Sequence, residues 1–183
     1  MAAASRWKCL FWAWFSRPRG DRALYRLIRR RRPQAIVEIG LRDGRRARRL
    51  IEMAQAYAAD RRVSYAGVDL FELRPAGEAR VPLKEVFRYL KCTGARLRLL
   101  PGDPFAALAR SANELTGTDL IVVSCDQDPQ SLARAWFYVP RMLHPGSEVY
   151  LEQIDERGAI SLRRITVREI EELAAPLVRR RAA

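Results

Sequence analysis

Acidic residues and glycines stand at the ends of two apolar segments, in a pattern typical of a nucleoside site. Residues 35–44 form an apolar run that contains Glu38 and ends with Gly40 and Gly44, just before a helical pattern begins. Glycine allows a ligand to approach the backbone closely, and the free N–H groups at the start of a helix favour an anionic group. Asp69 ends a second apolar run further along the chain. Since an acid at that place holds ribose hydroxyls in nucleoside-binding βαβ units, a ligand site is predicted where these segments end.

Five segments, in order along the chain, resemble the motifs of the class I S-adenosylmethionine-dependent methyltransferases. The segments are residues 38–44, 67–72, 97–103, 119–126 and 143–146. Their order and spacing carry the resemblance, which covers residues 33–155. The resemblance implies that the chain binds S-adenosylmethionine as its cofactor. The residues that match cofactor-binding positions are Glu38, Gly40, Arg42, Gly44, Asp69, Leu70, Gly102 and Asp103.

Three of these residues have two interpretations each. Arg42 stands where many members of the family have the middle glycine of the first motif. Its bulk could block the cofactor, or its charge could bind the methionine carboxylate of the cofactor. Glu38 and Asp69 could contact the ligand, or each could pair with a neighbouring arginine.

Apolar strand patterns alternate with helical patterns along the chain, which predicts a parallel sheet covered by helices on both faces. The expected fold class is a Rossmann-like three-layer α/β/α sandwich with a mainly parallel sheet of five or six strands, shortened at the C-terminus. The predicted helices are residues 45–59, 83–92, 104–115 and 129–142, and the predicted later strands are residues 96–100, 119–124, 148–151 and 159–165.

Both ends of the chain depart from this regular pattern. We expect residues 1–32 to form a basic, aromatic arm with a short helix capped by Asp21, and residues 33–183 to form the methyltransferase-like domain. Thr166 and Glu169 predict a capping box for a last helix. Pro176 is expected to kink or end that helix and to leave a charged tail.

Composition indicates one globular domain. The chain has 183 residues, of which 49% are hydrophobic and 30% are charged. This composition excludes a disordered chain, and the length allows one sizeable core. The three cysteines are widely spaced and indicate neither a disulfide framework nor a zinc site, so a cytoplasmic location is expected.

The positive charge is concentrated in the N-terminal third. The net charge is +13, and residues 1–62 contain 17 Lys or Arg against 5 acids, whereas residues 63–183 contain 17 against 16. Such a surface attracts nucleic acid or an anionic membrane. The alternative is that 31 Arg against 3 Lys reflects an arginine-rich composition in which many side chains only solvate helix faces.

Residues 5–15 place three of the four tryptophans beside cationic residues. The apolar core of this segment, residues 9–15, is far shorter than the ~20 residues that cross a bilayer. Residues 7–15 could anchor the chain at a membrane surface, or the segment could fold back and cover an apolar patch of the domain.

Catalytic candidates are few. Asp126 follows the fourth predicted strand and is expected to face the acceptor, while Ser124 and Gln127 stand where metal-dependent members of the family carry ligands, so no metal is expected. His144 is interpreted as a turn residue and Cys125 as a packing residue. The expected function is methyl transfer to an unidentified acceptor, with O-methylation of a small molecule favoured. The alternative is a catalytically inactive module that binds nucleic acid or another anionic partner through the basic N-terminal third; a homodimer is also left open.

Overall fold

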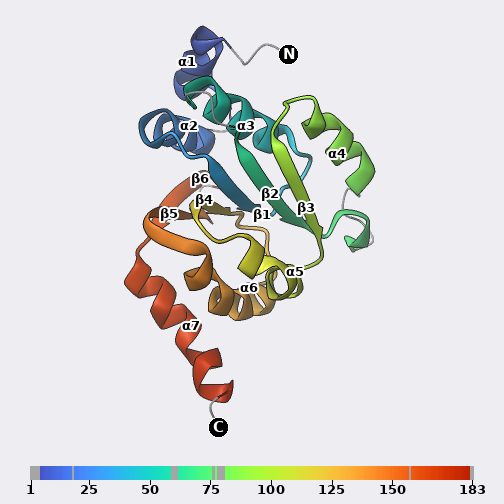
Figure 1. The fold of residues 1–183 in the computed structure, drawn as a ribbon, viewed down its shortest axis with the longest axis vertical. Helices are drawn as coiled ribbons and strands as arrows, with labels where there is room; N and C mark the ends of the chain where they lie inside the picture. Colours follow the sequence, from blue (N-terminus) through green and yellow to red (C-terminus); the bar gives the residue numbers. More distant parts are fainter. Residues whose placement is uncertain are drawn as a thin grey trace.

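Six strands form one sheet at the centre of the molecule (Figure 1). They are β1 (Ala35–Ile39), β2 (Ser64–Asp69), β3 (Arg96–Pro101), β4 (Thr118–Val123), β5 (Leu143–Ile154) and β6 (Ile160–Ile165). Their order across the sheet is β3-β2-β1-β4-β5-β6, in which β1 to β5 are parallel and β6 is antiparallel to β5. The predicted fold class, with one extra edge strand, is confirmed. The computed structural model describes residues 5–17, 19–58, 62–75, 77, 81–156 and 158–181, with side chains up to residue 175 in the last helix.

Helices cover both faces of the sheet, as the strand–helix alternation predicts (Figure 1). One face carries α1 (Arg6–Phe15), α2 (Arg19–Arg31), α3 (Arg45–Tyr57) and α4 (Leu83–Lys91). The other face carries α5 (Pro104–Ser111), α6 (Pro129–Ala135) and α7 (Val167–Arg181), with the 3-10 turns η2 (Ala112–Glu114) and η3 (Trp136–Met142). A further turn, η1 (Phe71–Leu73), follows β2.

The two faces hold separate hydrophobic cores because alternate residues of a strand point to opposite sides of the sheet. In β1, Ile36 joins the core under α2 and α3, whereas Val37 and Ile39 join the core under α5 and η3. The central strands β1, β2 and β4 are therefore largely buried on both faces, whereas the edge strand β3 exposes Arg96 and Arg98. Further polar side chains gather where the strands end. This is how the sheet positions the candidate site.

The N-terminal helices pack onto the sheet domain. Asp21 lies inside α2, buried, and accepts a hydrogen bond from the Tyr25 hydroxyl at 3.4 Å. The prediction that Asp21 caps this helix is therefore wrong, since the helix begins at Arg19. Gly20 lies against the backbone of Ile160 in β6, where a Cβ would come within 2.7 Å of the carbonyl oxygen. The division into an arm and a domain stays a prediction.

The capping box of the last helix is confirmed. The Glu169 N–H donates to the Thr166 hydroxyl at 3.2 Å, and the Thr166 N–H donates to the Glu169 carboxylate at 2.7 Å. The helix does not end at Pro176 but continues to Arg181, so the predicted charged tail is helical. His144 lies at the irregular start of β5, where its Nε2 is 3.0 Å from an Asp119 carboxylate oxygen.

The aromatic segment forms α1 and packs by one face only. Cys9, Trp12 and Ala13 are buried, and the Trp12 ring lies 6.5 Å from the Tyr25 ring of α2. The opposite face of the helix is exposed. Among the described residues, no helix combines the length and the hydropathy of a membrane span.

Candidate functional site

The turn from β1 into α3 has an unusual backbone. Gly40, Arg42 and Gly44 all have positive φ angles, of 87°, 58° and 75°. Gly44 occupies the N-cap position of α3. The turn thus makes three left-handed steps within five residues, which glycine adopts freely and arginine only at a cost. Arg42 therefore keeps the backbone conformation that a glycine would have at this position.

Arg42 contacts three strand ends, one through its backbone and two through its side chain. Its backbone N–H donates to Asp69 at 2.8 Å, which ties β1 to β2. Its guanidinium donates to Asp126 after β4 at 2.9 Å and to Glu152 of β5 at 3.2 Å. It is half-buried, and its pKa is raised because hydrogen bonds and nearby carboxylates outweigh the effect of burial. Arg42 therefore stays charged and acts as a clamp across the carboxyl edge of the sheet.

Gln127 lies directly against Gly40. A Cβ at Gly40 would come within 2.4 Å of the Gln127 amide nitrogen and 2.6 Å of the Ser124 Cβ. The same amide group donates to Asp126 at 2.8 Å. The absence of a side chain at Gly40 is thus required by the loop after β4.

Asp69 is nearly buried at the end of β2 and is paired with an arginine. Arg74 donates to both Asp69 oxygens at 2.8 Å, and the Phe71 N–H donates to Oδ1 at 3.0 Å. Leu70, half-buried, is the N-cap residue of the turn η1, which brings Arg74 back onto this carboxylate. Both carboxylate oxygens of Asp69 therefore accept hydrogen bonds from protein groups.

Glu38 belongs to a buried charge network beneath the turn. Its carboxylate accepts hydrogen bonds from Arg46 at 2.6 Å and from the Tyr65 hydroxyl at 2.5 Å. Arg46 also pairs with Glu152, whose other oxygen accepts from the Ser124 hydroxyl at 2.8 Å. Complete burial raises the pKa of Glu38, and the Arg46 guanidinium opposes that shift. Glu38 thus orders the site from below, and its contact with a cofactor stays a prediction.

Asp103 caps α5 at the third strand end. Its Oδ1 accepts from the N–H groups of Phe105 and Ala106 at 3.0 and 3.2 Å and from the Ser131 hydroxyl. Partial burial works against ionisation, but these hydrogen bonds prevail and lower the pKa of Asp103. Among the described residues, none of the hydrogen bonds reaches Oδ2. Gly102, with φ of 126°, donates its N–H to the Asp69 carbonyl oxygen at 2.9 Å. One oxygen of Asp103 is thus open to a donor.

Asp126 is ionised and exposed beside these groups. Burial of part of the side chain opposes ionisation, but hydrogen bonds from Arg42 and Gln127 outweigh it and lower the pKa of Asp126. A low pKa makes a carboxylate a weaker general base. In the described part of the chain, no group of three or more His, Cys, Asp or Glu side chains is arranged to hold a metal ion.

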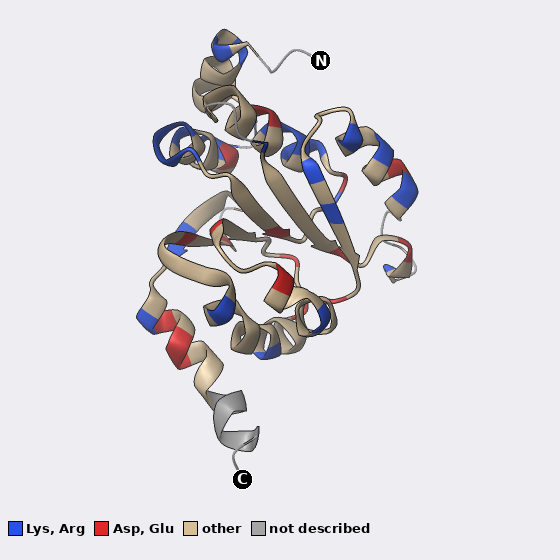
Figure 2. Cartoon of the chain, viewed as in Figure 1, with Lys and Arg blue, Asp and Glu red and all other residues tan. Residues whose placement is uncertain are grey.

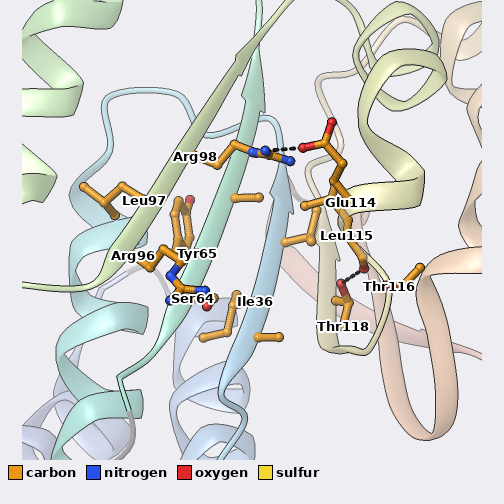
Figure 3. Close-up of a pocket in the computed structure, with 13 residues that line it drawn as sticks. Ile36, Ser64, Tyr65, Arg96, Leu97, Arg98, Glu114, Leu115, Thr116 and Thr118 are labelled. Atoms are coloured by element: carbon orange, nitrogen blue, oxygen red, sulfur yellow. Dashed lines mark hydrogen bonds and ion pairs between the residues drawn. The ribbon is translucent and has the colours of Figure 1, made fainter.

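Of two hollows in the surface, one adjoins this edge of the sheet and the other lies away from it. One, of about 590 Å³, is open to solvent beside the clamp and is lined by Cys125, Glu152, Gln153, Ile154, Asp155 and Ser161. Another, of about 520 Å³, lies on the sheet at the amino halves of β1, β2 and β3 (Figure 3). Arg98 and Glu114 form an ion pair across it, and Ser64 and Tyr65 of β2 lie below this pair in the view. Only the first hollow adjoins the candidate site.

The structure brings the predicted residues together at one edge of the sheet and adds partners that the sequence patterns did not identify. These partners are Arg46, Tyr65, Arg74 and Ser131. One signal was available for Arg46: it stands four residues before Leu50, on the side of the helix that carries the apolar residues, and not on the outer face with Arg45 and Arg48. For Arg74, which lies in an irregular turn, we find no comparable signal.

Comparison with known proteins supports the fold at low sequence identity. No protein-family model matches the chain, and no curated protein matches it. Among solved structures, an O-methyltransferase from Bacillus cereus in complex with SAH superposes with a TM-score of 0.55 at 14% identity, covering 90% of this chain and 70% of that one. A methyltransferase from Geobacter sulfurreducens gives a TM-score of 0.51 at 22% identity, covering 76% of this chain. This chain spans 62% of the length of the Geobacter protein.

A TehB-like SAM-dependent methyltransferase from Corynebacterium glutamicum gives a TM-score of 0.50 at 19% identity, covering 94% of this chain and 78% of that one. The strand order, the antiparallel last strand and these superpositions all indicate the same fold. The chain has the Rossmann-like fold of the class I S-adenosylmethionine-dependent methyltransferases. Since fold alone hosts many chemistries, the activity has to be argued from the site.

Proposed function

We propose that this protein is an S-adenosylmethionine-dependent methyltransferase whose cofactor binds at the carboxyl ends of β1, β2 and β3. The observation that carries the proposal is the turn at residues 40–44, with its three positive φ angles, beside Asp69 and Asp103. In open parallel sheets, ligands bind beyond the carboxyl ends of the strands. The acids and the turn belong to three adjacent strands, in the positions that the sequence pattern predicts.

The residues fit such a cofactor on the condition that Arg74 releases part of its contact with Asp69. Asp103 Oδ2 can accept a hydrogen bond from the exocyclic amino group of an adenine, because Oδ1 alone takes the capping bonds. Asp69 can accept from ribose hydroxyls only if Arg74 gives up part of its two-oxygen contact. The Arg42 guanidinium, which stays charged, is placed to attract the carboxylate of the methionine moiety.

The acceptor is expected beside the cofactor, in the open hollow next to Asp126. The cofactor supplies an electrophilic methyl group, and the protein has to hold the nucleophile in line with it. Asp126, exposed and ionised, can accept a hydrogen bond from an acceptor hydroxyl and orient it. Its low pKa favours orientation over complete proton removal. These features favour O-methylation of a small molecule, with cytoplasmic location as the accompanying expectation.

Calorimetric titration with S-adenosylmethionine and with its demethylated product tests the proposal. We expect saturable binding of both by the wild type and loss of binding in Asp69→Ala. Asp43→Ala is the matched control, because Asp43 is an exposed acid of the same turn that pairs with Arg45. Arg74→Ala should bind several-fold more tightly, since it removes the group that competes with ribose for Asp69. Equal affinities in all four proteins would contradict the assignment of Asp69.

A second candidate is a methyltransferase-like module that has lost the chemistry and binds an anionic partner. The observation that favours it is that arginines already satisfy both oxygens of Asp69 and of Glu152. Such a module would bind nucleic acid or another anionic partner through the N-terminal third, where exposed arginines end α2.

This candidate predicts no cofactor binding by folded protein. Affinity for a single-stranded oligonucleotide should then fall steeply with salt concentration, and charge reversal of residues 29–32 should weaken it. Binding that salt does not change would contradict nucleic-acid recognition.

A further inference from the structure

Helix α1 exposes an aromatic stripe that no other part of the described chain covers. Its members are Trp7, Phe11, Trp14 and Phe15, which are 80%, 59%, 52% and 66% exposed. Phe11 and Phe15 stack on each other, with ring centroids 5.5 Å apart. Soluble proteins rarely leave so many large aromatic side chains together in water, so a contiguous patch of this kind indicates an interaction surface.

The stripe has a defined place on the helix. At 3.6 residues per turn, its four side chains fall within an arc of about 100°. The opposite side of the helix packs on the protein through Cys9, Trp12 and Ala13. Because those anchors hold α1 in place, the stripe is a fixed surface rather than a consequence of an undocked segment.

Cations border the aromatic stripe. Arg6 and Lys8 are exposed and flank it on the two sides of the helix, by the same helical geometry. Arg26 of α2 lies over the Trp14 ring at 5.5 Å. Figure 2 shows Lys and Arg gathered on α2 and α3 beside α1, which lies at the end of the molecule far from the C-terminus. The aromatic stripe therefore stands within a positively charged surface.

We propose that this surface docks the protein on an anionic lipid bilayer, with α1 lying in the plane of the membrane interface. Tryptophan and phenylalanine side chains partition into the boundary between headgroups and acyl chains, while flanking Lys and Arg contact anionic headgroups. The proposal does not depend on methyltransferase activity, since α1 contributes no residue to the candidate site at the strand ends.

The charge and shape of the surface favour a bilayer over other partners. A second copy would bring two strongly basic N-terminal thirds together, and like charges oppose such a dimer. Single-stranded nucleic acid binds in basic grooves with aromatic platforms for successive bases. Here the rings project from the exposed side of a helix, and two of them already stack on each other.

Vesicle co-sedimentation and tryptophan fluorescence test the proposal. The probes are vesicles of phosphatidylcholine alone and of phosphatidylcholine with phosphatidylserine. We expect binding to the anionic vesicles, weakened by salt, with a blue shift of the tryptophan emission as Trp7 and Trp14 leave water. Trp7→Ala/Phe11→Ala should weaken vesicle binding about tenfold or more, because each exposed ring contributes transfer free energy at the interface.

Leu173→Ala is the matched control, because Leu173 is 42% exposed and lies on α7, which Figure 1 shows at the opposite end of the molecule from α1. It should bind vesicles as the wild type does. Circular dichroism checks that all variants fold, which is expected since the altered side chains are exposed.

Three results would overturn the proposal. The first is that folded wild-type protein fails to bind anionic vesicles. The second is vesicle binding without a fluorescence shift that persists in Trp7→Ala/Phe11→Ala, which would show attraction by charge alone. The third is a dimer, or a complex with single-stranded RNA, that the double variant abolishes while vesicle binding stays unchanged; the aromatic stripe would then serve that partner.

Discussion

Arg42 combines a strained backbone with a useful side chain. Its φ of 58° lies in the left-handed region, and its guanidinium joins the ends of β4 and β5. Any residue with a Cβ bears the backbone cost at this position, whereas only a long cation can make the contacts. An arginine at this position therefore costs backbone strain that a glycine would avoid, but it places a positive charge at the centre of the site.

Replacing Arg42 by Gly and by Ala separates the two effects. Both variants lose the ion pairs with Asp126 and Glu152, so they differ only by a Cβ in a left-handed conformation. We expect Arg42→Ala to be less stable than Arg42→Gly by about 1 kcal/mol. Urea denaturation of both variants measures the difference. If the alanine variant were equally stable or more stable, the backbone at residue 42 would not be strained.

Loss of Arg46 should strongly destabilise the protein. Arg46 is nearly buried and compensates Glu38 and Glu152, both of which are almost inaccessible to solvent. Arg46→Met keeps the aliphatic length but leaves Glu38 without its cation and Glu152 with Arg42 alone, so we expect a loss of about 3–5 kcal/mol in the free energy of unfolding.

Arg45→Met is the natural control for this experiment. Arg45 is 79% exposed and pairs only with the exposed Asp43 among the described residues. Its replacement should change stability by no more than about 0.5 kcal/mol. Similar losses in the two variants would show that the buried network does not depend on Arg46.

At the scale of elements, α5 depends on its N-cap. Asp103 accepts two backbone N–H bonds of the first turn and holds the hydroxyl of Ser131 at the start of α6. Asp103→Ala should therefore destabilise the protein by about 1 kcal/mol, whereas Asp103→Asn should keep most of the cap. Thermal unfolding of the variants against the wild type tests this, and equal losses for Ala and Asn would contradict a capping role.

We also expect Asp103 to make the stability of the folded protein depend on pH. Hydrogen bonds lower the pKa of Asp103 in the folded protein despite partial burial. Folding then favours the ionised carboxylate, so its stabilisation is present above the ordinary pKa of about 3.9 and is lost as the pH falls through the folded pKa. In Asp103→Asn this acid-dependent loss should disappear, which unfolding curves measured between neutral and acidic pH would show. A wild-type and a variant curve of the same slope would contradict the assignment.

For the whole molecule, the topology could be predicted, whereas the sequence left open whether Glu38 and Asp69 contact a ligand or pair with arginines, and it did not identify which arginines. Apolar runs that end in glycine or acid mark the strand ends, and the fold brings Gly40, Asp69 and Asp103 to one edge as expected. Which side chains pair with the acids depends on how the folded chain brings distant segments together. Arg46 reaches Glu152 across more than a hundred residues, and Arg74 returns through an irregular turn to Asp69. No periodicity in the sequence records such contacts.

The uneven distribution of charge along the chain is a property of the whole molecule. Nearly the whole net charge belongs to residues 1–62, while the candidate site lies where acids and arginines largely compensate one another. The basic helices and the strand ends can therefore serve separate purposes, the first attracting an anionic surface and the second binding a small ligand.

Amide hydrogen exchange with and without S-adenosylhomocysteine tests the proposed cofactor site, because it reports both whether this cofactor product binds and where. Bound ligand slows exchange in the segments that it orders. We expect slower exchange in residues 40–44, 69–74 and 102–105, at the carboxyl ends of β1, β2 and β3. Unchanged exchange throughout a folded protein, or protection confined to α1 and α2, would contradict a cofactor site at the strand ends.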